Sequence, residues 1–310
     1  MKTKIAVVGT GGVGGFLGGL LARYYEGSSE VEIYFISRGQ ALENIRRDGL
    51  RVDAQQGGFT ARPKAATDSA AEIGTMDYVL YCTKAYDVEG GIAGIMPCIG
   101  PRTVILPFLN GVDSAEKIKR MLPGNEVWDG CVYVVAYIVE PGHIVERTNG
   151  YRYLFGSPSG SADRLEALRS IFAEAGIEAR LEADIVRRVW DKFAFISTVA
   201  TATSYTDETY GGVLNDPKHR ADFTALLDEF QSVARARGVV LSEAIASRVV
   251  AQMERIPADT TTSMQRDFRA GRSTEVESLT GYIVREGCRL GVPTPVYDTM
   301  YHGLLGRTKK

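Results

Sequence analysis

Three glycines near the start of the chain have the spacing of a phosphate-binding turn. Gly9, Gly11 and Gly14 form the pattern G-x-G-x-x-G, in which Gly12 and Val13 fill the gap before the last glycine. The first glycine permits a tight turn, the second lets the backbone approach a pyrophosphate, and the third lets a helix pack closely on a strand. The pattern therefore predicts a dinucleotide-binding turn, and the alternative is a purely structural glycine turn.

The segments around this turn are those that such a site requires. Residues 4–8 are an apolar run typical of a buried strand, and apolar residues at helical spacing follow over 16–24. A second apolar run occupies 31–36. A glycine pattern of this spacing indicates dinucleotide binding only where a strand precedes it and a helix follows it, as here. The phosphates would then contact the free N–H groups at the positive end of that helix.

The end of the second predicted strand indicates which dinucleotide binds. NAD-selective sites usually carry an acidic residue there, which binds the ribose 2′-hydroxyl. This chain has Ser37, Arg38 and Gly39 instead. A guanidinium can bind a 2′-phosphate through two hydrogen bonds, so we predict NADP(H). The alternative for Arg38 is a solvated loop charge.

Lys192 is the best candidate for a proton donor. In a helix, Phe195, Ile196, Val199 and Ala200 would share its face, and all four are apolar. Desolvation over such a face lowers the pKa of a lysine towards the range useful for proton transfer. Hydride transfer needs one such donor besides a bound cofactor and an oriented carbonyl group. The alternative is a lysine that extends to solvent along a packed helix.

Two further polar residues follow predicted strands. Lys84 comes after the apolar run 77–83, and Asn110 comes shortly after the run 103–106. Ligands of open α/β sheets bind outside the carboxyl ends of the strands. We therefore expect both side chains at the same edge of the sheet as the glycine turn.

Composition excludes several classes of function. The net charge is −2, and no basic patch with interleaved aromatic residues suggests nucleic acid as a partner. No apolar run is long enough to span a membrane, and the N-terminus does not have the pattern of a signal peptide. The four cysteines and three histidines show no zinc-site spacing, so no metal is expected. Small buried thiols are expected, which makes the cytoplasm the default location.

The chain divides into two predicted domains. Residues 1–182 alternate strand and helix patterns, and from 183 to 310 helical patterns dominate. The predicted fold is an α/β N-terminal Rossmann-type dinucleotide-binding domain followed by an all-α C-terminal domain, which would supply the substrate and catalytic residues. Exposed apolar faces on the helical domain could support a homodimer.

Several segments together resemble the ketopantoate reductase (2-dehydropantoate 2-reductase) family, over nearly the whole chain. Gly9–Gly14 and Ser37–Gly39 resemble the family's cofactor segment, and Ile45–Leu50 resembles the helix and turn that follow it. The family's "VKA" and "QNG" motifs correspond to Cys82–Tyr86 and Asn110–Gly111, with Leu109 in place of the glutamine. Its "W-x-K" and "SSM-x-x-D-x-x-x-G-R-x-T-E" motifs correspond to Trp190–Lys192 and Thr262–Glu275. The last segment is the most specific, because its order and spacing would rarely arise by chance.

The resemblance implies an NADPH-dependent reductase of a small 2-oxo acid, most economically 2-dehydropantoate, which gives pantoate for pantothenate synthesis. It implies that Lys192 protonates the ketone oxygen and that Asn110 and Lys84 line the cofactor and substrate site. Ser263 and Glu275 would hold the substrate, with Glu275 counted among the catalytic residues. The alternatives are a helix N-cap for Ser263 and a solvated helix charge for Glu275.

Besides Leu109, the chain departs from the family at three positions. Ile196, Ala200 and Thr280 stand where the family has asparagines. One wall of the substrate site is therefore expected to be apolar, and an apolar wall discriminates poorly for a hydroxylated substrate. Two alternatives follow: a reductase of a different small 2-oxo acid, or a non-catalytic NADP-binding protein. Retention of Lys192 together with Glu275 argues against the second.

Overall fold

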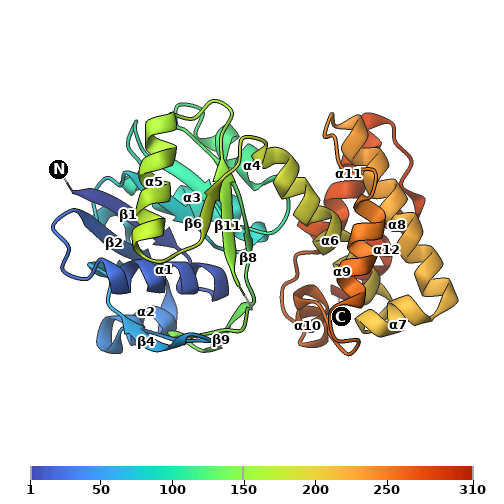
Figure 1. Ribbon diagram of the computed structural model, residues 1–310, viewed down its shortest axis with the longest axis horizontal. Coiled ribbons are helices and arrows are strands. Elements are labelled where there is room, and N and C mark those ends of the chain that lie inside the picture. The colour runs from blue at the N-terminus through green and yellow to red at the C-terminus, as the bar shows by residue number, and fades with distance from the viewer. Residues whose placement is uncertain (1, 149, 309–310) are drawn as a thin grey trace. The chain divides into compact units, whose positions relative to one another are not determined.

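The computed structural model describes residues 2–148 and 150–308 and forms two compact units (Figure 1). The first comprises Met1–Leu109 and Asp113–Ile185, and the second comprises Asn110–Val112 and Val186–Lys310. The short segment Asn110–Val112 thus belongs by its contacts to the second unit, although it lies in the sequence of the first.

A parallel five-stranded sheet is the centre of the first unit. Its order is β5-β2-β1-β6-β7, and every pair of neighbours is parallel. The strands are β1 (Thr3–Val8), β2 (Val31–Ile36), β5 (Ala65–Thr67), β6 (Tyr78–Tyr81) and β7 (Val104–Pro107). The strand order reverses between β1 and β6, which is the position where open α/β sheets bind their ligands.

Helices cover both faces of this sheet. They are α1 (Gly12–Tyr24), α2 (Gly39–Asp48), α3 (Val88–Ile95), α4 (Ser114–Met121) and α5 (Ala162–Glu174), with short 3₁₀ turns at Ala70–Glu72, Ala85–Asp87 and Met96–Cys98. Two separate apolar cores result, because strands buried on both faces carry apolar residues at successive positions. Phe16 and Phe35 belong to one core, and Ile92 and Ile118 belong to the other.

Two smaller sheets complete the first unit. One has the order β4-β3-β10-β9 and the other β12-β11-β8. Their strands are β3 (Leu50–Ala54), β4 (Gly57–Ala61), β8 (Asp129–Tyr133), β9 (Ala136–Glu140), β10 (His143–Glu146), β11 (Arg152–Gly156) and β12 (Ala179–Leu181). Helix α1 contacts both the central sheet and the sheet that contains β10, so its position is fixed from two sides.

The second unit consists of helices. They are α6 (Ile185–Thr206), α7 (Tyr210–Asn215), α8 (Pro217–Ala236), α9 (Ile245–Glu254), α10 (Ser263–Arg269), α11 (Tyr282–Leu290) and α12 (Pro295–Thr308), with a π-helical turn at Glu277–Gly281. Trp190 and Phe193 of α6 pack in edge-on and tilted contacts with Phe230 and Tyr282, with ring centroids 5.5–6.1 Å apart. These contacts hold α6 in the core of the unit.

The parallel sheet with helices followed by a helical domain confirms the predicted fold class. One detail differs from the expectations. Cys288 is exposed, whereas the other three cysteines are buried as expected.

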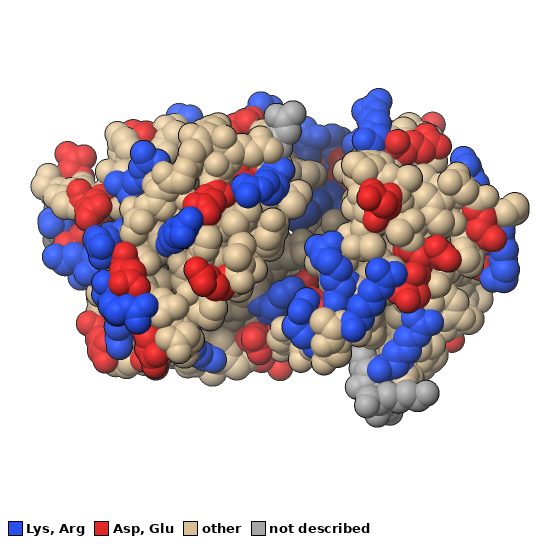
Figure 2. Space-filling view, turned by 90° about the horizontal axis from the view of Figure 1, so that it is seen from below, with Lys and Arg blue, Asp and Glu red and all other residues tan. Residues whose placement is uncertain are grey.

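Charged side chains of both signs lie on the face of the molecule seen in Figure 2. Figure 2 shows basic and acidic side chains interspersed on the face that it presents, in line with the net charge of −2. In the described part of the chain, no helix is both long and apolar enough to cross a membrane. No group of three or more acidic, histidine or cysteine side chains among the described residues could hold a metal ion.

Candidate active site

The glycine turn connects β1 to α1, and packing requires glycine at three of its positions, Gly9, Gly12 and Gly14. A Cβ at Gly12 would collide with the carbonyl oxygen of Ala136 in β9. Gly9 has a φ of 89°, a region that L-residues rarely adopt, and a Cβ there would lie 3.0 Å from the carbonyl oxygen of Cys82. A Cβ at Gly14 would collide with the carbonyl oxygen of Gly9 and would lie 2.6 Å from the Cβ of Cys82. The turn and the start of α1 therefore lie directly against the end of β6.

Gly11 is different, because a Cβ there would meet no atom within 4 Å. It is the N-cap of α1, and the first hydrogen bond of the helix runs from the N–H of Gly15 to its carbonyl oxygen. The N–H groups of Gly12, Val13 and Gly14 therefore have no partner within the helix. Open space beside N–H donors at the positive helix end suits a phosphate, so these residues fit the pyrophosphate of a dinucleotide.

A buried hydrogen bond joins this turn to the end of β2. The hydroxyls of Thr10 and Ser37 are 2.6 Å apart, and both residues are buried. The contact joins residues 27 positions apart, and its trace in the sequence is a hydroxyl residue in each of the two turns. It fixes the turn relative to the segment that carries Arg38.

Two cationic side chains follow strands of the same sheet. Arg38 is exposed at the N-terminus of α2, and within residues 2–148 and 150–308 its guanidinium has no hydrogen-bond or ion-pair partner. Lys84 is exposed after β6. Because neighbouring parallel strands end at one edge, both lie at the edge of the glycine turn.

Lys192 and Asn110 are in direct contact in the second unit. The Nζ atom of Lys192 donates a hydrogen bond to Oδ1 of Asn110 at 3.0 Å, across 82 positions of the chain. Lysine offers only donors, so the asparagine oxygen must face the ammonium. Lys192 is half-buried on α6, where Val199 and Ala200 of the expected apolar face are buried. The contact orients the ammonium.

Glu275 and Ser263 occupy positions that exclude both alternatives given for them. Glu275 is only 4 % exposed, so it is not a solvated helix charge, and burial of a carboxylate is costly unless it is paired. Ser263 is the first residue of α10, and the N-cap is Thr262, whose hydroxyl accepts a hydrogen bond from the N–H of Gln265 at 3.2 Å. Ser263 is exposed, and its hydroxyl is not used as the helix cap.

The three departures from the family pattern have different surroundings. Thr280 is fully buried, and its hydroxyl lies 2.7 Å from that of Thr201 in a hydrogen bond. Ala200 is buried as well. Ile196 is half-buried on the helix face of Lys192, one turn further along α6. An apolar side chain therefore shares the helix face of Lys192.

The chain is similar to known proteins over its whole length. Residues 5–160 match the family described as "Ketopantoate reductase PanE/ApbA", and residues 184–307 match "Ketopantoate reductase PanE/ApbA C terminal". A crystal structure of 2-dehydropantoate 2-reductase from Porphyromonas gingivalis W83 is 38 % identical with a TM-score of 0.86, covering 98 % of this chain and 100 % of that one.

Two further proteins are similar to this chain over nearly its whole length, at a lower sequence identity than the Porphyromonas gingivalis structure. An uncharacterized oxidoreductase of Bacillus subtilis is 29 % identical over 302 residues, which cover 97 % of each chain. A 2-dehydropantoate 2-reductase of Halobacterium salinarum is also 29 % identical, over 96 % of each chain. The similarity thus extends over both the α/β unit and the helical unit.

The contrast between Gly11 and Gly14 gives a prediction. Gly11→Ala should leave the melting temperature nearly unchanged, because its methyl group meets no protein atom, but should weaken NADPH binding, since that methyl group would face the phosphates. Gly14→Ala should lower the free energy of unfolding by about 1–3 kcal/mol or more through overpacking. Thermal unfolding and NADPH fluorescence titration measure both effects. Unchanged NADPH affinity in Gly11→Ala would contradict the phosphate-binding role.

Proposed function

The chain belongs to the ketopantoate reductase family, and from that premise we propose that it reduces 2-dehydropantoate to pantoate with NADPH, as a step of pantothenate biosynthesis. The observation that carries the proposal is the hydrogen bond from Lys192 Nζ to Asn110 Oδ1. It holds a proton donor in one orientation, which a reductase needs and a non-catalytic dinucleotide-binding protein does not.

The proposed reaction adds a hydride to the ketone carbon and a proton to the ketone oxygen. NADPH, when bound, supplies the hydride. Lys192 donates a proton from Nζ to the oxygen as negative charge develops there, and the resulting amine takes up a proton from solvent afterwards. Asn110 keeps the ammonium from rotating away, since the lysine side chain is otherwise free in several torsions.

The remaining predicted residues bind rather than react in this proposal. The exposed hydroxyl of Ser263 and the buried carboxylate of Glu275 hold polar groups of the substrate. Lys84 adds a positive charge for the anionic ligands at the sheet edge. The N–H groups of Gly12 and Val13 receive the pyrophosphate.

We propose NADP rather than NAD as the cofactor because of Arg38. Its guanidinium is exposed, and no side chain of the described residues pairs with it. Ser37, which precedes it, is held by Thr10 of the glycine turn. A cation in this position suits a 2′-phosphate, whereas a ribose 2′-hydroxyl is usually bound by a carboxylate.

A second candidate is the reduction of a different small 2-oxo acid. Ile196, half-buried on the helix face of Lys192, favours it, because the position lacks the amide that would bind a substrate hydroxyl. A site without such a partner accepts a branched or aromatic 2-oxo acid nearly as well as a hydroxylated one.

Replacement of Lys192 tests the function itself. Purified protein should oxidise NADPH with 2-dehydropantoate, followed by absorbance, and Lys192→Ala should lower kcat by about 10²–10⁴-fold because the general acid is lost. NADPH affinity should change little. Lys218→Ala, which removes an exposed lysine of α8, is the matched control and should keep full activity. A Lys192→Ala enzyme at wild-type rate would assign the lysine to packing.

Replacement of Arg38 tests the choice of cofactor. Arg38→Ala should raise the dissociation constant for NADPH by about 10–100-fold, the equivalent of one or two charge-assisted hydrogen bonds, and should leave that for NADH nearly unchanged. Fluorescence titration with both nucleotides gives the comparison. Equal weakening of both would mean that Arg38 does not contact the 2′-phosphate.

Ile196→Asn tests the substrate. For the wild type, kcat/KM with 2-oxoisovalerate and with phenylpyruvate should lie within about an order of magnitude of kcat/KM with 2-dehydropantoate. In Ile196→Asn, the ratio of kcat/KM for 2-dehydropantoate to that for either other acid should be about tenfold higher than in the wild type. Val186→Asn places the same amide on another face of α6 and should leave the ratios unchanged. A wild type that accepts only 2-dehydropantoate would exclude the second candidate, and turnover of none of the three would favour a non-catalytic protein.

A further inference from the structure

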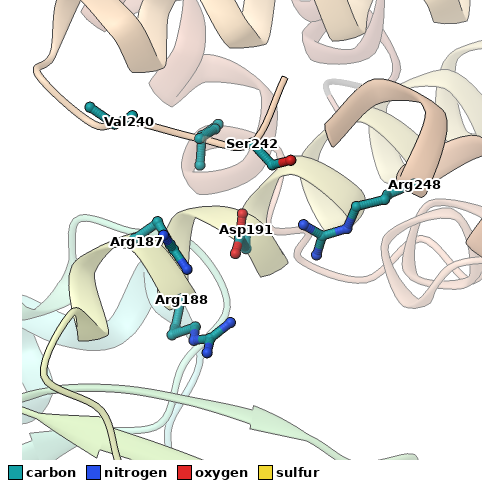
Figure 3. A pocket seen from close by; sticks show the side chains of 7 residues that line it. Arg187, Arg188, Asp191, Val240, Ser242 and Arg248 are labelled. Atoms are coloured by element: carbon teal, nitrogen blue, oxygen red, sulfur yellow. The ribbon is translucent and has the colours of Figure 1, made fainter. Parts of the chain in front are cut away.

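The helical unit contains a pocket lined by arginines at the first turns of α6. Its volume is about 350 Å³, within the range of small-molecule sites. It lies between α6, the loop before α9 and α9 itself (Figure 3), and its lining residues are Arg187, Arg188, Asp191, Val240, Leu241, Ser242 and Arg248.

A second pocket of about 300 Å³ adjoins the first and shares Asp191 and Arg248 with it. It adds Arg255 and Gln252 from the end of α9. The two pockets together present the guanidinium groups of four arginines and the carboxylate of one aspartate. Such an excess of positive charge in a concave surface attracts anions.

The aspartate in this pocket has an unsatisfied acceptor. The Oδ1 atom of Asp191 is buried and has no hydrogen-bond partner among the described residues. Figure 3 shows its carboxylate between Arg187 of the same helix and Arg248 of α9, with Arg188 below them. A buried acceptor without a donor costs free energy, so a ligand that donates a hydrogen bond here would gain affinity.

Arg248 is the cation available to such a ligand. Its guanidinium makes no side-chain hydrogen bond or ion pair within the described parts of the chain. Arg187 and Arg188 are each engaged in an interaction already, so Arg248 and Asp191 are the groups left to contact a ligand. An unpaired guanidinium and an unsatisfied carboxylate oxygen in one pocket call for an anionic group and a hydroxyl on one molecule.

This pocket is distinct from the proposed catalytic residues. Asp191 directly precedes Lys192, and successive residues of an α-helix point about 100° apart around the axis. Of the described residues that line the two pockets, none is Lys192, Asn110, Ser263 or Glu275. The pocket therefore faces a different direction from the ammonium that contacts Asn110.

We propose that this pocket binds a small phosphate monoester that carries a hydroxyl group. The phosphate accepts hydrogen bonds from Arg248, whose planar guanidinium matches two phosphate oxygens. The hydroxyl donates to Oδ1 of Asp191. The arginines of α6 add positive charge at the same pocket.

Isothermal titration calorimetry of the full chain at low ionic strength tests the proposal, with glycerol 3-phosphate, inorganic phosphate and glycerol as probes. Glycerol 3-phosphate should bind in the millimolar range or tighter, phosphate more weakly and glycerol not at all. Arg248→Gln should weaken glycerol 3-phosphate at least about tenfold through loss of charge-assisted hydrogen bonds. Arg235→Gln, an exposed arginine of α8 outside both pockets, is the matched control and should bind as the wild type does.

Asp191→Ala tests the hydroxyl contact. The variant should bind glycerol 3-phosphate no more tightly than phosphate, because the acceptor for the hydroxyl is lost. Its affinity for phosphate should not fall, because the substitution removes a negative charge from the pocket. Melting temperatures verify that each variant is folded. The assay contains neither NADPH nor a 2-oxo acid, so its result is independent of the proposed reductase activity.

Three results would overturn the proposal. One is no binding of glycerol 3-phosphate to the wild type, and another is equal binding of the probe to wild type and Arg248→Gln. The third is binding that Gly11→Ala abolishes and Arg248→Gln retains, because the probe would then occupy the dinucleotide turn. Equal affinities of the wild type for phosphate and glycerol 3-phosphate would overturn the assignment of Asp191 as the hydroxyl acceptor.

Discussion

The hydrogen bond between Lys192 and Asn110 is the interaction on which the proposed chemistry depends. It requires that α6 be fixed in its core, which the packing of Trp190 and Phe193 achieves, and that the segment after β7 reach the helical unit. A lysine loses about 2 kcal/mol of rotamer freedom when it is held in one conformation. The aromatic core and the position of Asn110 offset that cost, and the ammonium of Lys192 thereby has a defined place.

The dinucleotide turn depends on a constraint of a different kind, namely how closely two backbone segments approach. Gly14 lets α1 begin directly against Gly9 and the end of β6, while Gly11 leaves space beside the helix end. Close packing on one side and open space on the other are both consequences of missing side chains. The bond between Thr10 and Ser37 then fixes the turn against the segment that carries Arg38.

In the helical unit, the residues that the family resemblance singles out have different surroundings. The carboxylate of Glu275 is buried and the hydroxyl of Ser263 is exposed. Ile196 is half-buried on the helix face of Lys192, and Thr280 is engaged with Thr201 in the interior. Membership in an oxidoreductase family therefore indicates the class of reaction but does not identify the substrate. The arginine pocket at Asp191 is a feature to which the proposed reaction assigns no role.

The sequence by itself determined what is local: the apolar runs of the parallel strands, the glycine turn between the first strand and helix, and the family motif around Lys192. These depend on periodicity and on the conformations of neighbouring residues. Only the tertiary structure decided that Thr262 rather than Ser263 caps α10, that Glu275 is buried, and that Asp191 keeps an unsatisfied oxygen near Arg248. The contact of Lys192 with Asn110 joins residues 82 positions apart. Burial and pairing across such distances follow from how whole helices and strands pack, which no local pattern of residue types records.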